Sequence, residues 1–404
     1  MRSSALLAAS LLALSAPALA GEEALTLQPT RALKFTATTA TWTQLDLSPD
    51  GRTILFDVLG DIYALDAVAG GPARPVLTGM AFESNPVFSP DGRRFAFISD
   101  RSGAMNLWVA NVDGTGLKQL SRDTGMEVWS SPAWSPDGGK VYASRMTRPR
   151  LAFELFLFDV DGGAGLQLTE AGSPANWDTR HNALGAVASA DGNYLYYATK
   201  LGHTWTEDDP PNWQVARRDL RTGAEDVVIS APGGALHPAL SHDGRLIAYA
   251  SRKGGETGLR LRNLVTGEDR WIADRIDHDA QEGGYYADLT PRFTFAPDDR
   301  SIVMGLDGGI ARLDIASGSI APIPFTAQVD QRMGPLTRVS QKQEDGPVRV
   351  RIIQGPRQSP DGRTLAFTAL GALYVQALDG KAAPRRLVPA DAFQPSWSPD
   401  GRSL

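Results

Sequence analysis

The chain contains no cysteine, and this absence excludes disulfide bonds, cysteine-based zinc sites and thiol nucleophiles. Histidine is scarce: the five histidines include no His-x-His pair, and neither a His-Glu-x-x-His nor a Gly-x-Ser-x-Gly motif occurs. No dense basic run is present, and the formal net charge is −6. These absences argue against nucleic-acid binding and leave the chain without a recognisable catalytic constellation of its own.

A long apolar run is also missing, since nothing approaches the roughly 20 residues of a membrane-spanning helix. Ala5–Leu14 is an apolar run of about 10 residues that follows Arg2 and leads to Ala18-Leu19-Ala20. This pattern is typical of a signal peptide covering residues 1–20, with cleavage after Ala20. We therefore expect residues 21–404 to be periplasmic or secreted, without membrane insertion.

What the chain has in abundance is turn formers, with 41 glycines and 27 prolines. A Ser-Pro-Asp-Gly turn recurs, and neighbouring copies are spaced by 39 residues (Asp361 to Asp400) up to 63 residues (Asp298 to Asp361). Such spacing is typical of blade-sized units. The copies, of which the fourth to sixth are degraded, begin at Ser48, Ser89, Ser135, Ser189, Ser241, Ala296, Ser359 and Ser398.

Each residue of this turn has a physical role. Proline presets φ at the first corner, aspartate accepts hydrogen bonds from its own backbone, and glycine adopts the positive φ that closes a hairpin. Five copies have a proline three residues before the serine, and four have an aromatic residue directly before it. We interpret these aromatic residues as packing between neighbouring sheets.

Short β-like runs follow every turn in the same order, and with the run that precedes the turn they make four antiparallel strands per unit. The sequence thus predicts an all-β fold, a β-propeller of about seven four-stranded blades, with six to eight possible and a further repeat beginning at the C-terminus. The first strand after each turn is expected at Thr53–Val58, Arg94–Ser99, Lys140–Ser144, Tyr194–Thr199, Leu246–Ser251, Ser301–Gly305 and Thr364–Thr368.

An additional strand is expected near the N-terminus, where Ala32–Ala40 alternates between apolar and polar residues. Closing a propeller removes exposed sheet edges. We therefore predict that this segment pairs with the last blade and closes the ring.

The repeated pattern Pro-x-aromatic-Ser-Pro-Asp-Gly resembles the WD-like propeller repeat of the TolB and tricorn group. Longer stretches are similar to the N-terminal propeller of secreted amidohydrolase-family proteins, and the resemblance covers nearly all of residues 30–404. The stretches are Leu55–Asp66, Gly79–Leu107, Glu256–Trp271, Pro322–Val329 and Arg357–Tyr374.

That resemblance implies a metal-dependent amidohydrolase barrel after the propeller, and here the sequence departs from it. The chain stops at Leu404, directly after the eighth turn, so it looks truncated before a catalytic domain. None of His181, His203, His237, His242 and His278 forms the His-x-His pair that such a barrel requires. We expect no cofactor in this chain, and a divalent metal only in a C-terminal domain.

Three functions are compatible with these observations. The first is a non-catalytic propeller module of an exported amidohydrolase-like hydrolase, which gates or shields a partner active site. The second is a stand-alone periplasmic interaction propeller of Tol type, and the third is the propeller of a serine peptidase. The expected partner is a C-terminal hydrolase domain or another periplasmic protein. Whether the whole protein is an enzyme depends on what lies beyond residue 404.

The binding face is expected opposite the Ser-Pro-Asp-Gly turns. In four-stranded antiparallel blades the turns after the second and fourth strands share one face, and this face receives every long connection. One of them, Leu201–Trp213, carries candidate contacts to a peptide or a neighbouring domain, although a solvated acidic loop with its tryptophans tucked against the blade is the simpler interpretation. The candidates are His203, Trp205, Asp208, Asp209 and Trp213.

A second loop on that face carries Asp277, His278, Asp279 and Glu282. Oxygen-rich loops suit hard divalent cations. Chance clustering of polar residues in a long loop is the simpler interpretation here too, and we assign no metal ligand.

Overall fold

The computed structural model describes residues 28–147, 151–173, 175–176, 178–205, 212–281, 288–338, 340–342 and 346–404. Every regular element in these ranges is a β-strand. Consequently, the described part of the chain offers no helix with the length and apolarity needed to traverse a bilayer. The expected signal peptide, residues 1–20, lies outside the described residues. The all-β fold predicted from the repeats is confirmed.

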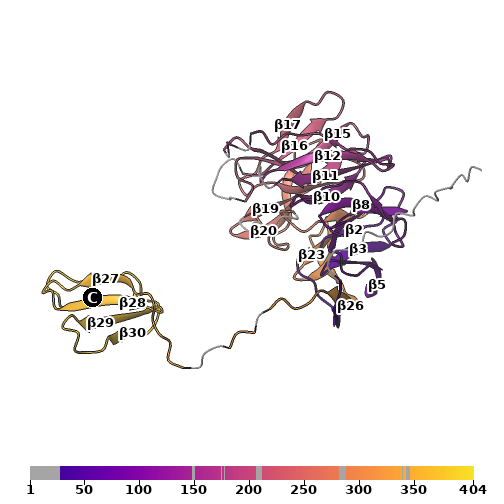
Figure 1. Cartoon of the computed structure of the whole chain (residues 1–404). Coiled ribbons are helices and arrows are strands. Elements are labelled where there is room, and N and C mark those ends of the chain that lie inside the picture. Colours follow the sequence, from indigo (N-terminus) through magenta and orange to yellow (C-terminus); the bar gives the residue numbers. More distant parts are fainter. Residues whose placement is uncertain are drawn as a thin grey trace, which may run out of the picture. The chain divides into compact units, whose positions relative to one another are not determined.

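The chain divides into two compact units, which the sequence analysis did not anticipate. Unit 1 comprises Met1–Leu336 and unit 2 comprises Thr337–Leu404. Figure 1 shows the strands of each unit, in indigo to orange for unit 1 and in yellow for unit 2.

Unit 1 is built from six blades, each a sheet of four strands that follow one another in the chain. Blade 1 consists of β2 (Leu45–Leu47), β3 (Thr53–Val58), β4 (Asp61–Asp66) and β5 (Gly71–Leu77). Blade 2 consists of β6 (Glu83–Phe88), β7 (Arg94–Ser99), β8 (Asn106–Asn111) and β9 (Lys118–Gln119). Blade 3 consists of β10 (Val128–Trp134), β11 (Lys140–Met146), β12 (Phe153–Asp159) and β13 (Leu166–Gln167).

Blades 4 to 6 repeat this plan. Blade 4 consists of β14 (His181–Ala188), β15 (Tyr194–Leu201), β16 (Gln214–Asp219) and β17 (Glu225–Ile229). Blade 5 consists of β18 (Leu236–Leu240), β19 (Leu246–Lys253), β20 (Glu256–Asn263) and β21 (Asp269–Ala273). Blade 6 consists of β22 (Thr294–Phe295), β23 (Ser301–Leu306), β24 (Gly309–Asp314) and β25 (Ile320–Ile323). The second strand of every blade begins where the sequence predicts it.

The Ser-Pro-Asp-Gly turns join the first and second strands of the blades. In blade 3, Ser135 Oγ donates to Asp137 Oδ1 at 2.5 Å and accepts the backbone N–H of Lys140 at 2.9 Å. Asp137 Oδ1 also accepts the N–H of Gly139 at 3.0 Å, while Gly138 has a φ of 67°. Since every one of these bonds lies within six residues, the turn is determined locally.

The six blades close into a ring. The first strands of successive blades contact one another from β2 through β22, and β2 in turn contacts β22 and β23. The Ser-Pro-Asp-Gly turns of neighbouring blades also pack closely on one another. A Cβ on Gly92 would lie 3.5 Å from Cδ of Pro49, and a Cβ on Gly51 would lie 3.3 Å from Cδ of Pro297. The second of these contacts joins blade 6 to blade 1. Six blades therefore complete the ring of unit 1, and the seventh sheet of the described residues, β27 to β30, belongs to unit 2.

The prediction that Ala32–Ala40 pairs with the last blade is wrong. The N-terminal strand β1 (Arg31–Ala37) pairs antiparallel with β26 (Phe325–Met333), and β26 pairs parallel with β5, the outer strand of blade 1. Blade 6 already has four strands of its own, so it offers no vacancy for an N-terminal strand. Instead β26, which follows blade 6 in the chain, covers the outer edge of blade 1 and β1 extends that sheet.

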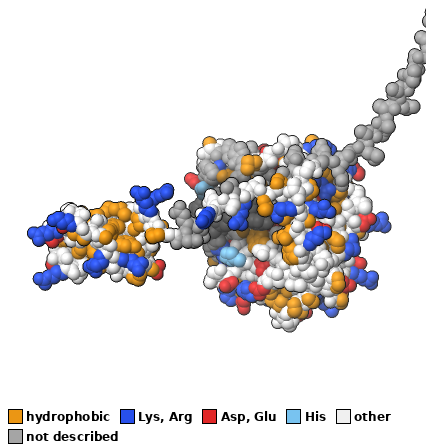
Figure 2. All heavy atoms as spheres, turned by 60° about the horizontal axis from the view of Figure 1, so that its bottom comes forward, with side chains coloured by type: hydrophobic (Ala, Val, Ile, Leu, Met, Phe, Trp, Pro, Cys, Tyr) orange, Lys and Arg blue, Asp and Glu red, His pale blue; other side chains and the backbone are white. Residues whose placement is uncertain are grey.

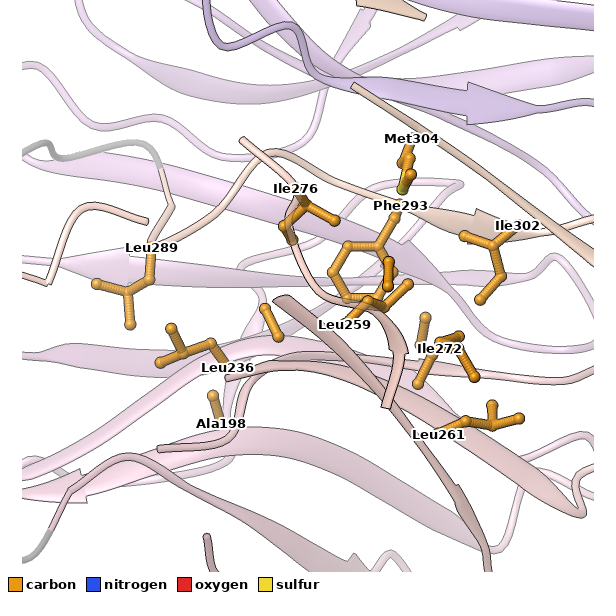
Figure 3. Packing of buried hydrophobic residues seen from close by; sticks show 14 of the residues in the cluster. Ala198, Leu236, Leu259, Leu261, Ile272, Ile276, Leu289, Phe293, Ile302 and Met304 are labelled. Atoms are coloured by element: carbon orange, nitrogen blue, oxygen red, sulfur yellow. The ribbon is translucent and has the colours of Figure 1, made fainter. Parts of the chain in front are cut away.

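The hydrophobic core lies between the sheets, as expected for a propeller. One cluster links β20 and β21 of blade 5 with β23 of blade 6 and includes Leu259, Ile272 and Met304. Figure 3 shows these side chains converging with Phe293 and Leu289, which come from the connection between the two blades. This connection therefore contributes to the core of the ring.

Unit 2 holds one more sheet of the same topology. Its strands are β27 (Gln354–Gln358), β28 (Thr364–Ala369), β29 (Ala372–Ala377) and β30 (Arg385–Val388). The expected further repeat follows, because Ser398 Oγ donates to Asp400 at 2.5 Å and a Cβ on Gly401 would lie 3.5 Å from Cδ of Pro360.

Candidate functional site

The long connections of unit 1 lie at the opposite end of the blades from the Ser-Pro-Asp-Gly turns, because they join second to third strands or lead from one blade to the next. The inferred strand pairing is thus confirmed. Two of these connections, between β15 and β16 and between β21 and β22, carry the residues singled out from the sequence. We call this end of unit 1 the loop face.

In the first of these connections the tryptophans serve the fold. Trp213 is fully buried, and its Nε1 donates to the carbonyl of Thr204 at 3.3 Å. Trp205 is half-buried and packs against a core cluster whose residues come from blades 3 to 6. His203 is also half-buried, whereas Asp208 and Asp209 lie outside the described residues. The indole of Trp213 therefore faces the interior of the blade rather than a partner.

In the second connection the polar residues are held by separate contacts. Asp279 is buried and accepts two hydrogen bonds from Arg252, at 2.7 Å from Nε and 2.6 Å from Nη2. Asp277 accepts the backbone N–H of Asp307 at 2.8 Å, and burial raises the pKa of the Asp277 carboxyl. His278 is exposed, and Glu282 lies outside the described residues. Among the described residues no group of three or more ligating side chains is positioned to hold a metal ion.

Sequence reasoning missed a ring of residues at the inner edge of the loop face. Each lies four positions before the first residue of a Ser-Pro-Asp-Gly turn. In blades 2 to 5 this residue has a positive φ between 47° and 67° and marks a shift in the register of the first strand, a β-bulge. The six residues are Gln44, Asn85, Ser131, Gly185, His237 and Arg292.

The signal for this ring was present in the sequence. In blades 2, 3 and 5 the positive-φ residue stands directly before the proline that precedes the turn, at Asn85, Ser131 and His237. The recurring proline thus coincides with the bulge in these three blades, but only the structure shows the positive φ and that these residues meet around one axis.

Two ring members from different blades meet an aspartate from a connection in a buried polar assembly at the loop face. Asp288, from the connection between blades 5 and 6, accepts a hydrogen bond from Ser131 Oγ and lies 3.1 Å from Nδ1 of His237. Burial by itself would raise the pKa of Asp288, but the His237 imidazole, the Ser131 hydroxyl and the Leu289 N–H hold it below its ordinary value. All three side chains are at most 5% exposed.

This assembly has the residue types of a hydrolytic triad but not its arrangement. In a triad the serine hydroxyl donates to the imidazole, which then removes its proton. Here both Ser131 and His237 contact Asp288, so the carboxylate stands between the other two groups. The assembly links blades 3 and 5 to the connection between blades 5 and 6, and in it the Ser131 hydroxyl donates to Asp288 and not to the imidazole.

Arg292 occupies the ring position of blade 6 and reaches across the axis. Its Nη1 lies 3.5 Å from the carbonyl of Pro132 in blade 3, the blade opposite. Its backbone N–H donates to Gln44 Oε1 at 2.9 Å, and its Nε lies 3.7 Å from Asp46 Oδ1. The ring axis is therefore bridged by a side chain at this end.

Asp57 joins blade 1 to blade 2. Its carboxylate accepts the backbone N–H of Gln44 at 2.9 Å and that of Asn85 at 3.3 Å. Burial raises the pKa of Asp57 to about 7, although the hydrogen bonds from Gln44 and Asn85 act to lower it. The described part of unit 1 thus carries a buried carboxyl that titrates near neutrality.

These residues border a groove of about 690 Å³ on the loop face, which we call the first-blade groove. Its size is within the range of pockets that bind small molecules or short peptide segments. The groove is lined by Phe35, Ala37, residues 39–42, Gln44, residues 57–60, Phe82, Ser84, Asn85, Asp277, His278, Asp307 and Gly308.

The comparison with known sequences gives partial matches. No family model matches the chain. It is 35% identical over 126 residues to the uncharacterized protein Atu1656 of Agrobacterium fabrum, an alignment that covers 29% of this chain and 42% of that protein. It is 31% identical over 179 residues to the TolB homolog of Chlorobium luteolum, covering 44% and 36% respectively.

A third partial match is 38% identical over 82 residues to the uncharacterized peptidase YuxL of Bacillus subtilis, covering 20% of this chain and 12% of that protein. The alignments with these three curated relatives thus span less than half of each relative's length.

Solved structures share the fold. TolB from Acinetobacter baumannii matches with a TM-score of 0.52 at 14% identity, over 71% of this chain and 65% of that one. The tricorn protease matches with a TM-score of 0.51 at 18% identity, over 87% of this chain and 31% of that one. The chain is therefore a β-propeller protein with the fold of TolB and of the tricorn protease propellers.

Proposed function

We propose that this chain is the non-catalytic propeller module of an exported amidohydrolase-like hydrolase, and that its loop face shields or gates the active site of that partner. The observation that carries the proposal is the loop face itself. It combines the long connections, the bridged ring axis and the first-blade groove, while Ser131, His237 and Asp288 lack the arrangement of a triad.

Arg292 gives this role a physical basis. Because its guanidinium spans from blade 6 to the Pro132 carbonyl of blade 3, it obstructs the axis at the loop face. If a partner protein docks on this face, Arg292 restricts access along the ring axis to the active site of that partner. Shielding of a partner active site is thus a function that the ring performs by its shape, without chemistry of its own.

Two alternatives are supported by specific observations. A stand-alone interaction propeller is supported by the shared fold with TolB from Acinetobacter baumannii. A peptidase propeller is supported by the match to the uncharacterized peptidase YuxL and by the shared fold with the tricorn protease. Both alternatives keep the loop face as the contact surface and differ in what it contacts.

The coding DNA beyond codon 404 discriminates between these functions. A barrel with a His-x-His pair supports the amidohydrolase module, a stop codon supports the stand-alone propeller, and a domain with a Gly-x-Ser-x-Gly motif supports the peptidase. Export is tested by sequencing the N-terminus of the protein from its native host, which we expect to begin at Gly21.

A biochemical experiment tests the absence of chemistry in this chain. Purified residues 21–404 are expected to show no metal-dependent hydrolysis of peptides, amides or lactones, because the sequence has no His-x-His pair to help hold a metal-activated water. Chelator-sensitive hydrolysis that is lost on replacing one of the five histidines would overturn the proposal.

A further inference from the structure

The first-blade groove is acidic. Its four titratable side chains are Asp57, Asp277, Asp307 and His278, and no lysine or arginine is among its lining residues. Arg275 pairs with one of these carboxylates, since its Nη1 and Nη2 lie 2.7 and 2.6 Å from the carboxylate of Asp307. The lining therefore has the charge of a surface for a cationic ligand.

One residue of the groove lining carries an unused donor. Gln44 is 2% exposed, and its Oε1 accepts the backbone N–H of Arg292. Its Nε2 has no hydrogen-bond partner among the described residues. Leaving a buried amide donor unpaired is unfavourable, and the carbonyl of a bound ligand is an acceptor that removes this penalty.

The walls are apolar and held in place. Trp42 Nε1 donates to the carbonyl of His278 at 2.9 Å, which fixes the indole to the connection between blades 5 and 6. On the other wall, a Cβ on Gly60 would come within 2.7 Å of Phe82 Cδ2, so the phenyl ring packs directly on the glycine. Aromatic walls beside carboxylates favour an arginine or lysine side chain. The aliphatic stem of such a side chain packs on the rings, and its positive charge is attracted to the rings and to the carboxylates.

We propose that the first-blade groove binds an extended peptide segment of a partner protein by receiving one basic side chain between Trp42 and Phe82, with its charged group directed to Asp277 and Asp57. The peptide carbonyl beside that side chain accepts the hydrogen bond of Gln44 Nε2. This inference names the partner chemistry for the loop face and rests on the proposed function as a binding module.

Other ligand classes fit less well. An anion has no basic side chain to meet in this groove. A metal ion has no set of three or more ligating groups among the described residues. A neutral apolar ligand would pack on the walls but leave Gln44 Nε2 and the carboxylates without new partners, so this class is the main competing outcome of the experiment.

The test uses the full mature chain and a fluorescent pentapeptide, acetyl-Ala-Ala-Arg-Ala-Ala-amide, titrated by fluorescence anisotropy. The matched peptide carries citrulline in place of arginine, which keeps the shape and removes the charge. We expect the arginine peptide to bind at least about tenfold more tightly than the citrulline peptide, because hydrogen bonds between charged groups are stronger than those of a neutral group. Added salt should reduce the difference.

Three variants locate the site. Asp277→Asn keeps an oxygen that accepts the N–H of Asp307 but removes the charge, and it should weaken binding of the arginine peptide about tenfold while leaving the citrulline peptide unchanged. Trp42→Ala should weaken both peptides. The control is Glu268→Gln, which removes an equal charge from the exposed turn between β20 and β21 and should change neither affinity.

The outcomes separate this inference from the proposed function. Equal binding of the two peptides, no binding of either, or an Asp277→Asn variant that binds like the parent chain would each overturn the assignment of a basic side chain to the groove. None of these results requires a hydrolase. If instead the groove binds as stated and the coding DNA shows no hydrolase domain, the proposed function fails while the groove assignment stands.

Discussion

The first strands of the blades differ sharply between the two units. In blade 2 of unit 1, all six residues of β6 are buried, whereas β27 of unit 2 is exposed along nearly its whole length. Yet the turns that follow these strands are alike: Ser89 Oγ donates to Asp91 at 2.6 Å and Ser359 Oγ donates to Asp361 at 2.5 Å. The turn therefore forms without neighbouring blades, while burial of the first strand depends on them.

The exposed surface of unit 2 has the same cause. Its exposed apolar residues include Leu370, Leu387, Val388 and Phe393, and Figure 2 shows hydrophobic side chains across the visible face of this smaller body. In the ring of unit 1, sheet faces are covered by the next blade. A blade inside the ring should therefore depend on packing against its neighbouring blades.

The largest expected effect concerns a phenylalanine at the same repeat position in each unit, Phe97 in β7 and Phe367 in β28. Phe97→Ala should destabilise unit 1 by about 3–5 kcal/mol, because removing the buried ring leaves a cavity between packed blades. Phe367→Ala should loosen the sheet of unit 2, where its ring stacks on Tyr374 at 5.7 Å, and leave the unfolding of unit 1 unchanged. Chemical denaturation with hydrogen exchange of β7 and β28 measures both.

If Phe367→Ala lowered the stability of unit 1 as much as Phe97→Ala does, the two units would unfold as one, and the contrast between them would be wrong. A control variant is Phe393→Ala. Its side chain is 72% exposed, so the change should alter the stability of either unit by less than about 0.5 kcal/mol.

A smaller effect is expected from removing β1. A chain that begins at Thr38 loses the antiparallel ladder to β26, whose partners run from Arg31 opposite Met333 to Ala37 opposite Ala327. Since blade 6 contacts blade 1 through β22, β23 and β2, the ring should stay closed. We expect faster amide exchange in β26, with protection in β22 and β23 retained. Loss of protection in β22 and β23 would show that β1 does close the ring.

The third prediction concerns pH and is confined to unit 1. The raised pKa of Asp57, about 7, means that the folded state holds a proton which the unfolded state releases near pH 4. Stability from this group is full below the unfolded pKa and is lost as pH rises toward and through 7. Asp57→Asn should flatten this decline between about pH 4 and 7. The measurement is the urea midpoint across that range.

Unit 2 supplies the control for this prediction, since the position equivalent to Asp57 is Thr368. The exchange of unit 2 amides, corrected for the intrinsic pH dependence, should show no matching loss of stability. A decline of unit 1 that persists unchanged in Asp57→Asn would assign the effect to another carboxyl.

The smallest effect should be equal in both units. Hydrogen bonds from Ser89 and Ser359 hold the pKa values of Asp91 and Asp361 below their ordinary value. The stability of each turn is therefore present above the unfolded pKa and lost as pH falls through the folded pKa. Asp91→Asn and Asp361→Asn should each reduce the acid sensitivity of their own unit slightly, measured by amide exchange near pH 3 and 5. A reduced acid sensitivity in only one of the two units would show that neighbouring blades support the turn.

The limits of prediction follow from the range of the interactions. The start of β28 at Thr364 was predictable because its turn is set by Ser359 and Asp361 close by in the chain. The first-blade groove was not, because it brings Trp42 beside His278 and Asp57 beside Asn85. Of the candidate residues, Trp213 is buried, as the simpler interpretation of its loop predicted, whereas the burial of Asp279 was not predicted because it depends on contact with Arg252 from β19.

The sequence by itself determined the turns, the strands that follow them and the all-β propeller fold, because these depend on hydrogen bonds and φ preferences within a few residues. Only the tertiary structure decided that six blades close the ring, that β26 and β1 extend blade 1, and that Ser131, His237 and Asp288 meet at the loop face. Those arrangements join residues far apart in the chain, and they are selected by which sheet faces and edges remain to be covered once each blade has formed.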